Sequence, residues 1–311
     1  MNRRTVSIAL LIGLLGMLLS GCFEHEVKLQ VARNGTGAIK ETTYFSPQML
    51  AMLAGMKGAF EQGMGEGAEP APPDPNAPNP LLKQMMDREE LEAKAAEYGE
   101  GVKLKDAQPV KLADGRQGVE VVYVFSDVSK VRIPLDPDQP GGDMDFPGPG
   151  MGMEEMPEEA KEPEDEKEYA KMMFTRGLGA APARLTVLLP QDEEEGPTTA
   201  PAAPQVSPEE RAMQMAGMQM MSGLRLRVLI VPQGQITKTN ATFVDKKTNT
   251  VTLIDLNFDE MLKNKKLMEE MMAGGQTKSV TELREKMKAK DPEMTKALKF
   301  EPSEKVIIEF K

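Results

Sequence analysis

The chain has 311 residues and a net charge of −11, with 49 acidic against 38 basic side chains, 25 methionines and no tryptophan. This acidity argues against nucleic acid and anionic lipid head groups as electrostatic partners. The single cysteine excludes a disulfide within the chain.

The N-terminus has the order of residues found in a bacterial export signal. A basic segment, residues 1–4, precedes an uncharged apolar run over residues 6–19. That run of about 14 residues is shorter than the roughly 20 that span a bilayer as a helix. It ends in an aliphatic residue, two small residues and the cysteine, Leu19-Ser20-Gly21-Cys22.

This tetrapeptide resembles the lipobox of bacterial lipoproteins. The resemblance implies a signal peptide over residues 1–21, cleavage between Gly21 and Cys22, and a mature Cys22 that carries N-acyl and S-diacylglycerol groups. Several acyl chains make a stable membrane anchor, whereas one chain is marginal. An uncleaved signal anchor, and a free cysteine near an ordinary cleavage site, are the alternatives.

The lipoprotein interpretation carries expectations about place and partners. Cleavage removes two arginines and no acid, so the net charge of the mature chain becomes −13. Phe23 stands where enteric bacteria place the Asp that retains lipoproteins at the inner membrane. This favours the outer membrane, facing the periplasm or the cell surface. The expected partners are the membrane, the lipoprotein-processing and sorting machinery, and an envelope protein.

The first half of the mature chain predicts two hairpins and two helices. Residues 25–32 alternate between apolar and polar side chains, as a half-buried strand does, and residues 38–45 return as its partner. Ser46 then begins a helix over 47–60 as its N-cap. The remaining predicted elements of this half are a helix over 81–98, strands over 101–111 and 117–126, and a short turn over 126–131.

The second half continues this alternation. Its predicted strands cover residues 184–189, 224–231, 236–244, 250–255 and 305–310, with 250–255 paired back on 236–244. Its predicted helices cover residues 208–222, 257–273 and 280–289. Acidic segments rich in Pro and Gly, expected to be flexible, cover about 61–80, 134–167 and 191–207. The predicted fold is α+β: a mainly antiparallel sheet of hairpins with interspersed helices, in a single interrupted domain over 22–311.

The stretch from Leu224 to Leu253 contains a further resemblance. Residues 224–232, 234–241 and 249–253 follow a strand, turn, Thr-Asn-Ala, strand order. This order is similar to that of uncharacterised envelope lipoproteins of the mycobacterial LppM type. In this chain the turn is one residue longer than Pro-Gly, and Leu253 replaces an aromatic residue. The resemblance implies a fold and an envelope location, and it implies no chemistry or cofactor.

A methionine cluster is the sharpest candidate for a metal site. Thioether sulfur suits Cu(I), and close Met spacings let several sulfurs reach one ion. Methionines at these spacings on a helix also make an adaptable apolar face for packing, which we favour. The cluster comprises Met213, Met215, Met218, Met220 and Met221.

Other candidate sites are weaker. One is an acidic group that lacks the spacing of a Ca²⁺-binding loop, and we interpret it as a solvated loop. It comprises Asp136, Asp138, Asp143 and Asp145. His25, the only histidine, is three residues from Cys22, and we expect it to be an exposed strand residue. Phosphate-loop and Gly-x-Ser-x-Gly signatures are absent from the sequence, while hydrolysis by paired carboxylates stays open.

Two functions therefore remain. The favoured hypothesis is a non-catalytic, membrane-anchored envelope lipoprotein that acts as a protein- or lipid-interaction module. The alternative is a periplasm-facing lipoprotein that binds a ligand or a soft metal, using the Met-rich helix over 213–221.

Overall fold

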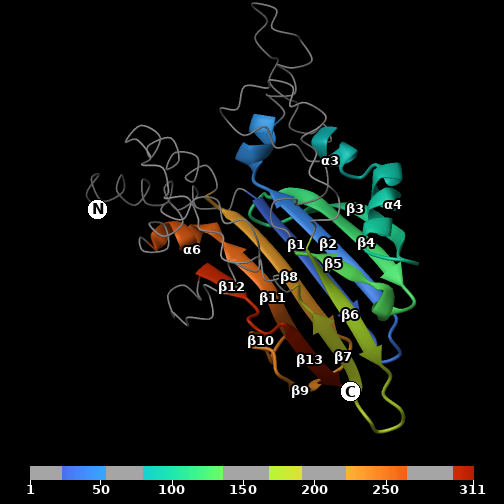
Figure 1. Cartoon of the computed structure of the whole chain (residues 1–311). Coiled ribbons are helices and arrows are strands. Elements are labelled where there is room, and N and C mark those ends of the chain that lie inside the picture. Colours follow the sequence, from blue (N-terminus) through green and yellow to red (C-terminus); the bar gives the residue numbers. More distant parts are fainter. Residues whose placement is uncertain (1–22, 54–79, 136–167, 191–221, 265–296) are drawn as a thin grey trace, which may run out of the picture.

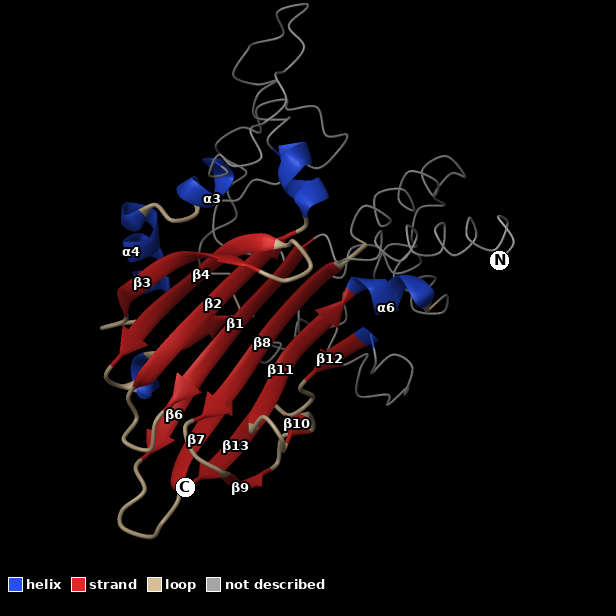
Figure 2. Cartoon of the chain, turned by 180° about the vertical axis from the view of Figure 1, so that it is seen from behind, coloured by secondary structure: helices blue, strands red, loops and turns tan. Residues whose placement is uncertain are grey.

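Figure 1 shows the computed structural model of the whole chain, which describes residues 23–53, 80–135, 168–190, 222–264 and 297–311. Most of this part of the chain lies in β-strands, with a few short helices at the ends and along one edge (Figure 2). The strands are antiparallel with one exception, so the predicted α+β class with a mainly antiparallel sheet is confirmed.

One of the two layers of the fold is a large sheet of eight strands. Its order is β10-β11-β8-β1-β2-β4-β3, and β12 pairs with the free edge of β11. The exception to antiparallel pairing is central, because β1 lies parallel to β8. The bounds are β1 Phe23–Val31, β2 Gly37–Phe45, β3 Lys103–Lys111, β4 Gln117–Phe125, β8 Leu224–Pro232, β10 Val244–Asp245, β11 Thr250–Asn257 and β12 Leu298–Phe300.

A second, smaller sheet covers part of one face of the large sheet. Its order is β5-β6-β7-β13-β9, with every pair antiparallel. The C-terminal strand, β13, lies between β7 and β9. The bounds are β5 Arg132–Pro134, β6 Tyr169–Thr175, β7 Ala183–Leu188, β9 Ile236–Thr239 and β13 Lys305–Phe310.

The chain crosses between the sheets where a hairpin was predicted. After β8, Gln235 exchanges two backbone hydrogen bonds with Lys311, which directs β9 onto β13. The predicted pairing of 250–255 with 236–244 is therefore wrong for β9 and holds only at Val244 of β10, which pairs with Val251. β11 pairs mainly with β8 instead.

Two helices are shorter than predicted. Asp87 accepts hydrogen bonds from the backbone N–H groups of Glu89 and Glu90 and so begins a new helix, which splits the helix predicted over 81–98. Asn264 is extended, so the helix predicted over 257–273 ends before it. Ser46 caps the helix predicted over 47–60, with its Oγ 3.1 Å from the Met49 N; residues 47–53 are helical, and 54–60 lie outside the described residues. The helices are α3 Pro80–Gln84, α4 Arg88–Glu97, a 3-10 turn Val128–Lys130 and α6 Phe258–Lys263.

The predicted flexible segments are only marginally covered by the described residues. Pro80 and Pro134, at their edges, belong to α3 and β5. Leu135 is also described and is buried, so the predicted flexible segment begins too early there. Residues 61–79, 136–167 and 191–207, the helix predicted over 208–222 except Ser222, and the helix predicted over 280–289 lie outside the described residues.

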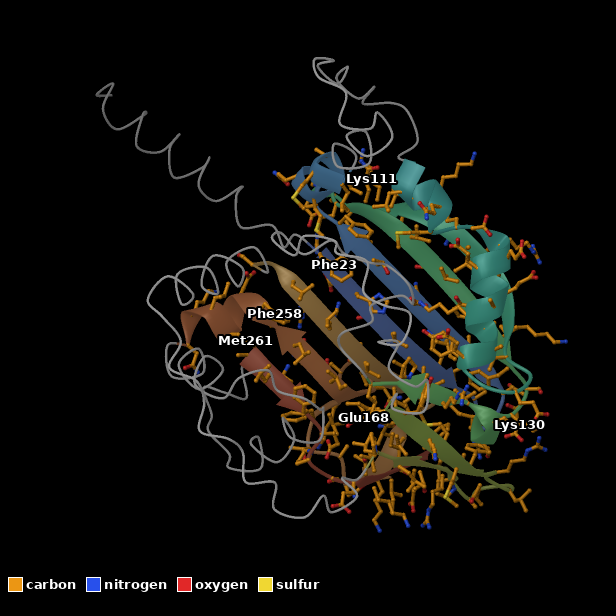
Figure 3. The ribbon with its side chains drawn as sticks, turned by 45° about the horizontal axis from the view of Figure 1, so that its top comes forward. Phe23, Lys111, Lys130, Glu168, Phe258 and Met261 are labelled. Carbon is orange, nitrogen blue, oxygen red and sulfur yellow. The ribbon has the colours of Figure 1, made fainter. Side chains whose placement is uncertain are left out.

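The two ends of β1, and of the large sheet around it, have different neighbours. The register places Phe23 of β1 beside Phe45 of β2 and Leu224 of β8. Figure 3 shows Phe23, Lys111 and Phe258 toward this end. The other end of β1 meets the small sheet.

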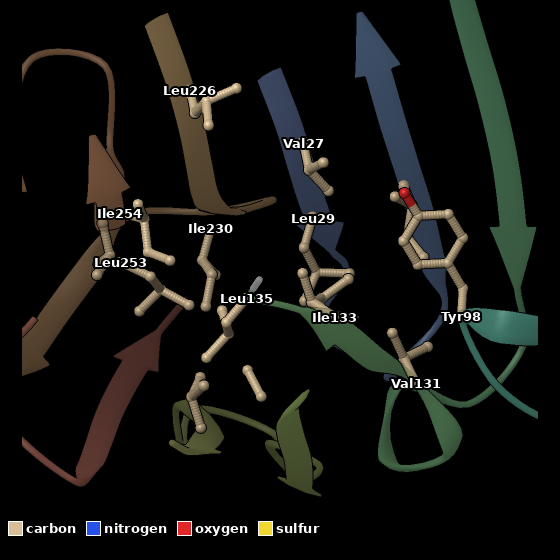
Figure 4. Packing of buried hydrophobic residues seen from close by; sticks show 14 of the residues in the cluster. Val27, Leu29, Tyr98, Val131, Ile133, Leu135, Leu226, Ile230, Leu253 and Ile254 are labelled. Carbon is tan, nitrogen blue, oxygen red and sulfur yellow. The ribbon is translucent and has the colours of Figure 1, made fainter. Parts of the chain in front are cut away.

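The apolar core lies between the two sheets. Leu29, Ile230 and Leu253 of the large sheet face Ile133 and Leu135, which enter from β5 and the residue after it (Figure 4). All five side chains are buried. Because one buried cluster includes side chains of both sheets, packing between the layers stabilises the fold.

Candidate functional site

A group of polar side chains is buried on the face of the large sheet that carries the core. It lies where α4 covers β2 and β4, beyond the part that the small sheet covers. Exposed fractions of 8% for His25, 5% for Glu41 and 0% for Tyr123 show that water has little access. The polar cluster comprises His25 of β1, Glu41 and Thr43 of β2, Lys94 and Tyr98 of α4 and its C-cap, and Tyr123 of β4.

Glu41 is the centre of the polar cluster. Its Oε1 lies 2.5 Å from Lys94 Nζ and 3.7 Å from His25 Nε2. The Tyr98 hydroxyl donates a hydrogen bond of 3.1 Å to the other carboxylate oxygen. His25 Nδ1 lies 2.9 Å from Thr43 Oγ1, so the contacts run continuously from β1 through β2 to α4.

Burial and neighbouring charges decide which groups of the cluster are ionised. Desolvation lowers the pKa of His25 from 6.5 to about 4, although Glu41 partly opposes this shift. Burial alone would raise the pKa of Glu41, but Lys94 and His25 together hold it below its ordinary value. At neutral pH the cluster therefore contains an ionised Glu41–Lys94 pair beside a neutral imidazole. Burial raises the pKa of both tyrosines, so both stay protonated.

The contacts among Thr43, His25 and Glu41 follow the order of a nucleophile, a base and an orienting acid. Thr43 is only 4% exposed, however, and the imidazole and the carboxylate are as deeply buried. A substrate would have no route to the hydroxyl between the strands and α4. We therefore assign the polar cluster to the stability of the fold, where it joins three strands and a helix.

The position of His25 corrects the sequence-based expectation. It is buried on the core face, because it shares the inward phase of Val27, Leu29 and Val31 along β1. That alternation is visible in the sequence and was the signal for its burial. Glu41 is likewise in phase with the buried Ile39 and Phe45, whereas nothing in the sequence pairs it with Lys94.

The opposite face of the large sheet carries charged side chains in pairs. Glu24 contacts both Arg116 and Arg227, and Arg227 also contacts Glu26 at 3.0 Å. On the neighbouring strands Asp255 binds Arg225 at 2.9 Å. Acidic and basic side chains are paired with one another across these strands, so this face does not present a site of one charge.

The other sequence-predicted site residues are not placed by the structure. Cys22, the methionines over 213–221 and the acidic group over 136–145 lie outside the described residues. Among the residues that are described, no group of three or more His, Cys, Asp or Glu side chains has the arrangement of a metal site. The Cu(I) hypothesis therefore stays a prediction.

Two asparagines of the segment over 224–253 have structural roles. Asn240 takes the place of a strand residue beside β13: its Nδ2 donates to the Lys305 carbonyl at 2.8 Å and its Oδ1 accepts from the Ile307 N–H. Asn249 has a positive φ of 56°. Its side chain accepts from the Ile236 N–H and donates to the carbonyls of Pro232 and Gly234. These contacts stabilise the crossing between the two sheets.

Substitution of Asn249 tests that role. Asn249→Ala should lower the free energy of unfolding by about 2–3 kcal/mol, because it loses the side-chain hydrogen bonds and strains a positive φ. Asn249→Gly keeps the φ and should cost about 1 kcal/mol less than Asn249→Ala. Urea unfolding followed by circular dichroism measures both variants. Two variants as stable as the parent would contradict the assigned role.

Comparison with known proteins gives little further information. No known family profile matches the chain, and no curated protein sequence matches it. The NMR structure of the folded domain of LppM from Mycobacterium tuberculosis is similar over 76% of this chain and 84% of that one. The sequence identity is 10% and the TM-score 0.24. A similarity at this TM-score carries no argument about fold or function.

No helix in the described part of the chain is both long and apolar enough to cross a membrane.

Proposed function

We propose that this protein is an envelope lipoprotein, cleaved between Gly21 and Cys22 and anchored in a membrane by lipid on Cys22. The observation that carries the proposal is the position of β1. The described strand runs from Phe23, the residue directly after the lipobox-like sequence, so cleavage between Gly21 and Cys22 would leave this central strand complete.

The first residue of β1 is firmly held. Phe23 is 2% exposed, its ring contacts the Phe45 ring edge-on at 5.3 Å, and its backbone N–H donates to the Gly223 carbonyl. The proposed cleavage site leaves only Cys22 before Phe23. This position agrees with a protein that folds after its signal peptide is removed. Cleavage further along would remove part of the central strand.

For the folded part of the chain that follows Cys22 we propose a non-catalytic role in contact with an envelope protein or with lipid. Of the two membranes, we favour the outer membrane. Burial of the polar cluster supports this role, since the Glu41 carboxylate, the His25 imidazole and the hydroxyls of Thr43 and Tyr98 contact one another within the fold. The strong negative charge of the chain supports the exclusion of nucleic acid as a partner.

Replacement of the cysteine tests the anchor. Cys22→Ser in the full chain should abolish incorporation of labelled palmitate and leave an uncleaved precursor, because serine lacks the thiol that accepts diacylglycerol. Ser20→Ala keeps a small residue before the cysteine and should mature normally. Mass spectrometry of the N-terminal peptide measures both outcomes. A Cys22→Ser protein that matures like the parent would overturn the proposal.

A further inference from the structure

We call the end of the large sheet at Phe23 of β1 the anchor end. One row of paired residues defines it, and three chain segments extend beyond that row: the helix over 47–53, the turn over 112–116 and α6. The row contains Lys111, Gln117, Phe45, Phe23, Leu224 and, displaced by one residue, Asn257.

These segments are joined to one another and to the sheet. The turn over 112–116 lies against the start of the helix, since a Cβ at Gly115 would be 3.8 Å from Pro47 Cγ. At the other side, Asp259 of α6 accepts hydrogen bonds from the Gly223 N–H at 2.6 Å and the Ser222 hydroxyl at 3.0 Å. The anchor end is therefore built on the sheet rather than carried on a separate arm.

Apolar side chains remain accessible at the anchor end. Met52 is 56% exposed on the helix over 47–53, while Met49 and Leu53 of the same helix are half-buried against the core. Leu112 of the turn and Phe258 of α6 are also half-buried. An exposed methionine flanked by half-buried apolar side chains suits the interface between lipid head groups and acyl chains, where an apolar face is buried to a depth of about 5–10 Å.

Chain geometry places this surface next to the lipid. Successive Cα atoms are about 3.8 Å apart, so a lipid-bearing Cys22 stays within one peptide unit of Phe23. Phe23 is fixed by its pairing with β2 and β8 and cannot extend as a linker. The far end of the nine-residue strand β1 is roughly 26 Å away.

We propose that the anchor end rests on the bilayer surface that holds the acyl chains, with Met52 and its apolar neighbours in the interfacial layer and β1 directed away from the membrane. This inference rests on the proposed lipid anchor, and it adds an orientation and a contact surface to it. The small sheet and the turn between β1 and β2 then face away from the lipid.

The opposite end is the natural control, because it also carries an exposed apolar side chain. Leu178, in the loop between β6 and β7, is 81% exposed. This loop is fixed to the turn after β1, where Arg33 donates to the carbonyls of Gly179 and Ala181 at 3.2 Å. It is the yellow-green loop at the bottom of Figure 1.

The absence of tryptophan from the sequence permits a direct test. Met52→Trp and Leu178→Trp each introduce one fluorophore, and each full-length protein is isolated in its lipidated form and reconstituted into phosphatidylcholine vesicles with brominated acyl chains. We expect the emission of Met52→Trp to shift to the blue and to fall at least about twofold relative to non-brominated vesicles. The emission of Leu178→Trp should not change.

Each outcome decides the inference. Quenching of Leu178→Trp alone, of both variants, or of neither variant in vesicle-bound protein would overturn the orientation. Mass spectrometry of the same samples reports lipid on Cys22, so loss of the anchor is distinguished from a wrong orientation. Thermal unfolding midpoints equal to that of the parent show that the substitutions leave the fold intact.

Discussion

Lys94→Met should lower the free energy of unfolding by about 3 kcal/mol, because it leaves the carboxylate of Glu41 buried without its cation. Methionine keeps the length of the side chain, so the loss reports charge rather than packing. The unpaired carboxylate should have a raised pKa, and protonation then relieves the cost. The destabilisation should therefore be smaller at pH 5 than at pH 8. Urea unfolding at both pH values, followed by circular dichroism, measures this difference.

A double variant separates the ion pair from the rest of the polar cluster. Glu41→Gln with Lys94→Met removes both charges but keeps an oxygen that can accept the Tyr98 hydroxyl. It should be more stable than Lys94→Met alone, since no unpaired charge remains buried. Lys130→Met breaks an exposed pair with Glu100 and should change little. Equal losses in the single and double variants would contradict the importance of the buried charge.

The second large effect concerns pH. The folded protein should lose about 2 kcal/mol of stability between pH 7.5 and pH 5, and about 3 kcal/mol once the pH is below 4, through His25 alone. Its pKa is about 4 in the fold and 6.5 when unfolded. Between these values the unfolded chain binds the extra proton, so lowering the pH favours unfolding. Glu41, with its lowered pKa, adds a further loss only below about pH 4.5.

Attribution to one group is possible because His25 is the only histidine in the chain. His25→Gln retains a polar group near Thr43 and does not titrate, so the loss between pH 7.5 and pH 5 should nearly disappear. In the parent, the single imidazole signal in the proton NMR spectrum should titrate with a midpoint near 4. A midpoint near 6.5 would show that the imidazole is solvated, and would contradict its burial.

Strands with strong alternation were predicted correctly from the sequence. β1, β2, β3 and β4 lie within two residues of their predicted bounds, because each has either a buried face or a short turn of positive-φ residues beside it. The missed strands, β5, β6 and β12, are short or lie beside acidic segments. A three-residue strand has too few positions to show a period of two.

The polar cluster was only partly predictable. The phase of His25 and Glu41 along their strands indicates burial, so the expectation that His25 is exposed is wrong. Contact between Glu41 and Lys94 joins residues 53 positions apart. This contact depends on the start of α4 at Asp87, which places Lys94 next to Glu41 of β2 and Tyr98 next to Tyr123 of β4.

What the sequence determined by itself is local: the lipobox-like segment before Phe23, the first two hairpins, the Ser46 cap, and the inward phase of each strand. These follow from short-range sterics, backbone hydrogen bonding and the alternation of side chains. Only the tertiary structure decided the division into two sheets, the parallel pairing of β1 with β8, and the burial of a charge pair under α4. The reason is that pairing between distant segments depends on which apolar faces pack together, and strands of similar composition do not encode that choice locally.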